Sequence, residues 1–111
     1  MEFHEISASI KVAACVCARD GLISHAEETM MFKIISEKFS GYSLDQFNLV
    51  IDEFFNSNDQ IENYLQAITN TEIREFTLCL AKNSACADGL DFRENIAIQK
   101  AYLTWGIEPN E

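Results

Sequence analysis

Apolar side chains recur at the spacing of an α-helix along almost the whole chain, and this periodicity constrains the fold more than any other feature. In the clearest case, Ile61, Tyr64, Leu65 and Ile68 occupy positions i, i+3, i+4 and i+7, which form one face of a helix. No segment shows the two-residue alternation that is typical of a half-buried β-strand. The sequence therefore predicts an all-α fold.

Turn residues and capping pairs divide this pattern into about six helices. The four glycines fall between periodic segments, and the single proline follows the last one. Four helix starts carry a Ser, Thr or Asp with Glu or Gln three residues later, as in a capping box: Ser24–Glu27, Ser43–Gln46, Thr69–Glu72 and Asp91–Glu94. The predicted helices span residues 3–19, 24–40, 44–56, 59–69, 71–87 and 92–105. Short connections between them predict a single compact bundle over residues 1–111.

Several expectations about individual side chains follow from the pattern. The last helix is apolar on nearly all sides, so we expect it to be central, with Tyr102 and Trp105 in the core. The two histidines, His4 and His25, are expected at the surface. The four cysteines lie in apolar helical stretches and are expected to be buried thiols, not disulfides or zinc ligands: Cys15, Cys17, Cys79 and Cys86.

The charge of the chain excludes some classes of partner. Eighteen acidic and eight basic side chains give a formal net charge of −10, which repels the phosphate backbone of nucleic acids. The longest apolar run, residues 12–18, is far shorter than the roughly 20 residues that cross a bilayer. The N-terminal sequence is acidic where a signal peptide has a basic start, so we expect a cytoplasmic protein.

A helix–Asp-Gly–helix unit occurs twice. Asp20 and Gly21 join the first two predicted helices, and Asp88 and Gly89 join the last two. In each copy an apolar residue, a capping Ser or Asp and a Glu follow. The repeat predicts two hairpins related by a pseudo-twofold axis, with their Asp-Gly loops close together.

Two interpretations of these loops stay open. In the first, the Asp-Gly pairs only end one helix, and Glu27 and Glu94 only cap the next. In the second, Asp20, Glu27, Asp88 and Glu94 pool their carboxylates around a divalent cation, because four crowded carboxylates repel each other. Such oxygen ligands favour Ca²⁺ or Mg²⁺ over Zn²⁺.

The first loop overlaps only half of an EF-hand. Asp20 and Glu27 match the fifth and twelfth positions of that calcium loop, whereas Val16 and Ala18 replace the oxygen ligands expected at the first and third. A complete EF-hand is therefore not expected, and any cation site needs both loops.

The two Asp-Gly units, Ala18-x-Asp20-Gly21-x-Ile23-Ser24-x-x-Glu27 and Ala87-Asp88-Gly89-x-Asp91-x-x-Glu94, resemble the TerB-like domain of tellurite-resistance and related stress proteins. The resemblance covers nearly the whole chain. It implies a compact helical domain with an acidic metal site at Asp20, Glu27, Asp88 and Glu94, and a role in bacterial stress systems together with protein partners. Arg19 and the shorter second loop depart from the family pattern.

No enzymatic motif competes with this interpretation. The chain has no Gly-rich phosphate loop, no nucleophile elbow, no HExxH sequence and no Glu-x-x-His pairs of a di-iron bundle. We therefore expect a non-enzymatic domain that binds a divalent cation and acts with protein partners. The alternative is an acidic interaction scaffold that needs no metal and whose Asp-Gly loops are purely structural.

Overall fold

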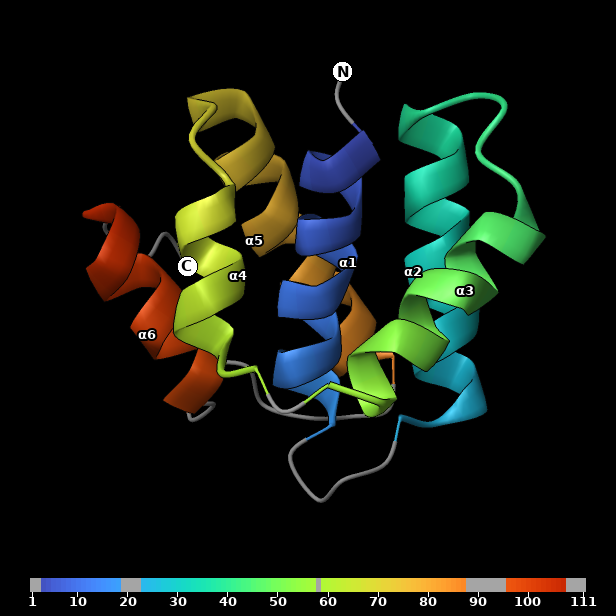
Figure 1. The fold of residues 1–111 in the computed structure, drawn as a ribbon, viewed down its shortest axis with the longest axis horizontal. Coiled ribbons are helices and arrows are strands. Elements are labelled where there is room, and N and C mark those ends of the chain that lie inside the picture. Colours follow the sequence, from blue (N-terminus) through green and yellow to red (C-terminus); the bar gives the residue numbers. More distant parts are fainter. Residues whose placement is uncertain (1–2, 19–22, 58, 88–95, 108–111) are drawn as a thin grey trace.

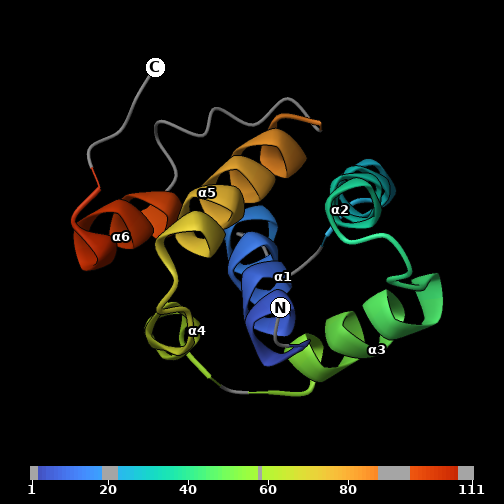
Figure 2. The same ribbon diagram turned by 90° about the horizontal axis from the view of Figure 1, so that it is seen from above.

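The first helix, α1 (Phe3–Cys17), lies at the centre of the molecule and packs against all five other helices (Figures 1 and 2). Its buried side chains cover most of the helix surface, and the row of Ser7, Lys11 and Cys15 is half-buried. The expectation that the last helix is central is wrong: α6 (Ile96–Trp105) lies at the edge, where Leu103 is 82% exposed. The unbroken apolar run at residues 12–18 is what distinguishes α1.

The computed structural model describes residues 3–18, 23–57, 59–87 and 96–107. These residues form six helices and no strand, as expected; the remaining four are α2 (His25–Lys38), α3 (Leu44–Phe55), α4 (Ile61–Ala67) and α5 (Thr71–Cys86). The radius of gyration, 12.5 Å, is that of a single globule of this length. The helices are up to a few residues shorter than predicted, and the predicted start of the last helix, residues 92–95, lies outside the described residues.

The central packing contact is between α1 and α5, which run side by side in the same direction (Figure 1). One buried hydrogen bond fixes their relative position: the Thr77 hydroxyl donates to Ser9 Oγ over 2.8 Å and shares its proton with the Ile73 carbonyl at 2.6 Å. The Ser9 hydroxyl in turn donates to the Glu5 carbonyl. Ser84 lies further along the same buried side of α5, and among the described residues its fully buried hydroxyl has no hydrogen-bond partner.

Of the four predicted capping pairs, those at Ser24 and Ser43 are confirmed, the one at Thr69 is wrong, and Asp91–Glu94 lies outside the described residues. Ser43 and Gln46 form a complete capping box at α3. At α5 the cap is Asn70 and not Thr69, because Asn70 Oδ1 accepts hydrogen bonds from the backbone N–H groups of both Glu72 and Ile73.

Two glycines end helices as predicted. Gly41 follows α2 and Gly106 follows α6. Both have a positive φ, a backbone conformation that residues other than glycine rarely adopt. Beyond α6, the N–H groups of Gly106 and Ile107 donate to the carbonyls of Leu103 and Tyr102, which is the Schellman pattern. Trp105 is buried and Tyr102 half-buried, so only the first is fully in the core.

We expect opposite effects from two substitutions in α5. Thr77→Val removes the bond to Ser9 and should lower the free energy of unfolding by about 1 kcal/mol. Ser84→Ala removes a buried hydroxyl that lacks a partner, and should leave that free energy unchanged or raise it by up to about 1 kcal/mol. Urea denaturation of both variants measures the difference. Equal losses from both would contradict a structural role for the Ser9–Thr77 bond.

Candidate functional site

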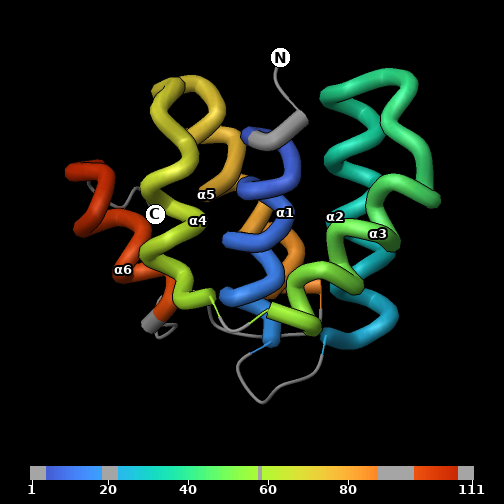
Figure 3. The backbone as a smooth tube through the Cα atoms, in the orientation of Figure 1, coloured from blue at the N-terminus to red at the C-terminus, as the bar shows by residue number. Residues whose placement is uncertain are grey.

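The described ends that flank the two Asp-Gly segments lie at one end of the bundle (Figures 1 and 3). α1 and α5 both end there, and α2 and α6 both begin there. The two parallel helices are also in matching register: Asp20 lies eleven positions after Ser9, and Asp88 lies eleven positions after Thr77, the residue hydrogen-bonded to Ser9. The two Asp-Gly pairs thus follow at equal distances along the chain from the bond that joins α1 and α5.

Of the four predicted ligands, Glu27 is the one within the described residues; Asp20, Asp88 and Glu94 lie outside them. Glu27 is only 2% exposed. Its Oε1 accepts a hydrogen bond of 2.8 Å from the Ser24 N–H, and Ser24 Oγ accepts one of 3.1 Å from the Glu27 N–H. The predicted capping box at Ser24 is therefore confirmed, and it holds a buried carboxylate at the positive end of α2.

Neither histidine adds to the site within the described part. His25 begins α2 and is exposed, as expected, whereas the side chain of His4 is not described. Over residues 3–18, 23–57, 59–87 and 96–107, no three His, Cys, Asp or Glu side chains come close enough together to hold a metal ion. In the same ranges, no helix is both long and apolar enough to cross a bilayer.

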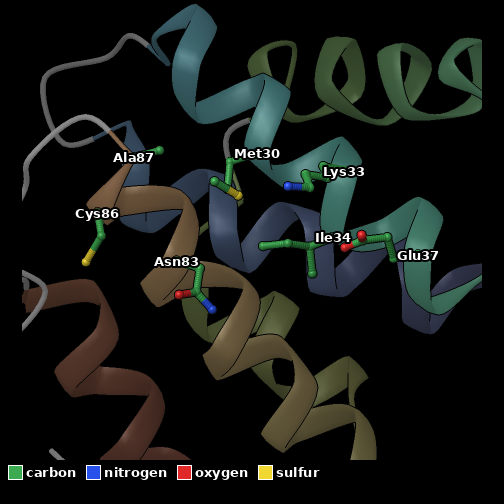
Figure 4. A pocket seen from close by; sticks show the side chains of 7 residues that line it. All are labelled: Met30, Lys33, Ile34, Glu37, Asn83, Cys86 and Ala87. Carbon is green, nitrogen blue, oxygen red and sulfur yellow. The ribbon is translucent and has the colours of Figure 1, made fainter.

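A groove lies between α2 and α5, next to the end of the bundle at which α5 ends (Figure 4). Its volume is about 370 Å³, and its lining comprises Met30, Lys33, Ile34, Glu37, Asn83, Cys86 and Ala87. Sequence reasoning did not identify this groove. α2 carries two apolar rows, and only the row of Met31 and Ile35 is fully buried; Met30 and Ile34 from the other row line the groove. The width of the apolar stripe on α2 was the signal for it.

The prediction that all four thiols are buried is wrong for two of them. Cys17 is buried and Cys15 half-buried, but Cys79 and Cys86 are exposed on the outer side of α5, where Asn83 donates a hydrogen bond to Cys79 Sγ over 3.2 Å. The apolar residues around them in sequence belong to the inner side of that helix. Burial, and secondarily the charge of Glu62, raises the pKa of the Cys15 thiol to about 12.

Comparisons with models of known protein families, with curated protein sequences and with solved structures find no match to this chain.

Two substitutions distinguish the contribution of the α2 capping box to the free energy of unfolding from the contribution of the Glu27 charge. Ser24→Ala should lower the free energy of unfolding by about 1 kcal/mol, because the N–H of Glu27 loses its acceptor. Glu27→Gln should cost much less, since Gln46 makes the same kind of box at α3. Chemical denaturation of both variants tests this. A large loss from Glu27→Gln would mean that the charge itself stabilises this helix end.

The thiols should fall into two classes in the folded protein. Cys79 and Cys86 should react with a disulfide reagent within minutes at pH 8, because they are exposed. Cys17 should react only after unfolding, because it is buried, and Cys15 should react much more slowly than Cys79, because it is half-buried and its raised pKa keeps the thiol protonated at that pH. Mass spectrometry of the labelled peptides identifies the sites. Labelling of Cys15 at the rate of Cys79 would contradict the packing of α1.

Proposed function

We propose that the chain is a non-enzymatic, TerB-like stress-response domain that binds a divalent cation between its two Asp-Gly segments. The observation that carries this proposal is the matching register of α1 and α5: Asp20 and Asp88 follow the hydrogen-bonded residues Ser9 and Thr77 by the same number of positions. Equal distances from the Ser9–Thr77 bond, together with helix ends that lie at the same end of the bundle, favour Asp20 and Asp88 as neighbours. The same arrangement supports the pseudo-twofold relation of the two hairpins.

The state of Glu27 supports a cation at this end. A carboxylate that is removed from water needs compensating partners, and the bond from Ser24 supplies one of them. A cation shared with Asp20, Asp88 and Glu94 would supply a second and would relieve the repulsion among the four carboxylates. Carboxylate oxygens are hard ligands, so the proposed ion is Ca²⁺ or Mg²⁺ and not Zn²⁺.

The proposed partners are proteins. A net charge of −10 favours a basic protein surface and disfavours nucleic acid. In the proposed role the cation fixes the angle between the hairpins, and the domain acts through its partner in tellurite resistance or a related bacterial stress system. Any effect on tellurite would then be indirect, because an anionic protein is a poor binder of an oxyanion.

A second candidate function is an acidic interaction scaffold that needs no metal. The observation that favours it is the confirmed capping box, which already gives Ser24 and Glu27 a structural role without any ion. In this case the Asp-Gly segments only end helices, and the basic partner recognises the negative surface.

Thermal unfolding after chelation, with Ca²⁺, Mg²⁺, Mn²⁺ or Zn²⁺ added back separately, tests the proposal. An ion at about 100 times its dissociation constant should add roughly 2.7 kcal/mol to the free energy of unfolding, which raises the midpoint by roughly 10 °C in a domain of this size. Asp20→Asn and Asp88→Asn should each abolish the rise. Glu27→Gln should weaken it while keeping the cap of α2.

Asp52→Asn is the matched control, because Asp52 is an exposed acidic residue on α3 and not one of the proposed ligands. It should leave the response to cations intact. A response that survives in Asp20→Asn and Asp88→Asn, but not in Asp52→Asn, would place the ion elsewhere. If no cation changes the midpoint at millimolar concentration, the cation site is refuted and the scaffold is favoured.

A further inference from the structure

Helix α3 carries three of the four large apolar side chains that are exposed in the described part of the chain. Leu44, Leu49 and Phe55 are 52%, 63% and 49% exposed, and the fourth is Leu103 on α6. A single exposed apolar side chain is ordinary on a protein surface. Three on one helix of twelve residues, at the periphery of the bundle (Figure 2), are a candidate interaction site.

The helical spacing places these side chains away from the inner side of α3. The buried residues of α3 are Phe47, Val50 and Ile51. Leu49 lies on the far side of the helix from them, and Leu44 and Phe55 lie on one flank, about 17 Å apart along the axis. The Phe55 ring packs edge-on against Phe54 with the ring centres 5.2 Å apart, so its exposed part is held in place.

Acidic side chains alternate with the apolar ones on this face. Asp45 and Asp52 are exposed and lie four and three residues from Leu49, so they are its neighbours on the helix surface. Glu53, at the other flank, already pairs with Lys11 of α1 at 3.2 Å. Neither Asp45 nor Asp52 forms an ion pair in the described part of the chain, so their charges are not compensated there.

This combination distinguishes α3 from the other described helices. Only α3 and α4 contain neither Lys nor Arg, and α4 has no large apolar side chain that is exposed. α3 therefore differs from the rest in joining an apolar patch to negative charge without any positive charge of its own.

The charge selects among the possible occupants of this face. A second copy of the chain would bring acidic residues against acidic residues, and like charges across an interface oppose association. An anionic membrane surface and nucleic acid are repelled for the same reason. A basic amphipathic helix is attracted, because its Lys or Arg side chains can pair with Asp45 and Asp52 while its apolar stripe covers Leu49.

We propose that the outer face of α3, formed by Leu44, Asp45, Leu49, Asp52 and Phe55, binds a basic amphipathic helix of another protein. The two helices would pack with their axes about 8–10 Å apart. The length from Leu44 to Phe55 requires about three turns of the partner helix. This deepens the proposed function, on which the existence of a natural basic partner rests, but the binding face itself does not require the cation site.

Titration of the full chain with a synthetic Leu/Lys peptide of about four turns, patterned as an amphipathic helix, tests the proposal. Fluorescence anisotropy of the labelled peptide should show saturable binding, and amide NMR signals should shift along α3. A shuffled peptide of the same composition should bind at least about tenfold more weakly, because it has no continuous apolar stripe. No saturable binding up to about 1 mM peptide, equal binding of the shuffled peptide, or shifts confined to other helices would overturn the proposal.

Leu49→Gln should weaken binding of the Leu/Lys peptide about tenfold, because it removes the apolar contact at the centre of the face. Leu103→Gln is the matched control, since Leu103 is an exposed leucine on α6, and it should leave binding unchanged. Both side chains are exposed, so both variants should keep the fold, which circular dichroism checks. Equal binding by the two variants would overturn the proposal.

A second pair of variants tests the charge. Asp52→Asn should weaken binding about threefold at low salt, by the loss of one surface ion pair, and the difference should vanish at high salt. Glu75→Gln, at an exposed position on α5, removes the same charge elsewhere and should have no effect. Equal weakening by both would mean that the peptide follows the net charge and not this face, which refutes the proposal. Since Asp52→Asn should keep the response to cations, loss of peptide binding and loss of the cation response are separate results.

Discussion

The parallel packing of α1 and α5 is the contact on which the other helices depend. α1 is buried over most of its surface, so other helices must surround it, and α5 covers most of one side. The Ser9–Thr77 bond sets their register in a place where water cannot substitute for either hydroxyl. α2 then packs mainly against α5, although α1 is its neighbour in sequence, and α3, α4 and α6 cover the remaining sides of α1 (Figure 2).

This register has an electrostatic consequence at one end of the bundle. The ends of α1 and α5 and the starts of α2 and α6 lie there, so carbonyl groups and N–H groups without helical partners meet at the same end. Glu27 shows how the chain uses acidic groups at such a place, because its carboxylate is buried and bonded to the start of α2. Capping and cation binding are compatible functions for this residue: the cap uses one carboxylate oxygen, and the proposed ion needs another.

The sequence predicted the helices well and their neighbours poorly. Periodicity identified the buried face of α4, at Ile61, Tyr64, Leu65 and Ile68, because that face depends on local spacing alone. Capping at Ser24 and Ser43 was equally local. The choice of central helix was wrong, and so was the burial of Cys79 and Cys86, because these depend on which helices pack together. The Ser9–Thr77 register joins residues far apart in sequence, and neither has a periodic signal of its own.

The two sequence-related hairpins meet the central pair of helices differently. α2 packs mainly against α5, with Met31 and Ile35 fully buried and a complete capping box at its start. α6 packs against α4, α5 and α1, and the Trp105 indole donates to the Leu65 carbonyl. An ion bound between the two Asp-Gly segments would therefore join two helices that share α1 and α5 as neighbours, and its free energy of binding would oppose their separation from that central pair.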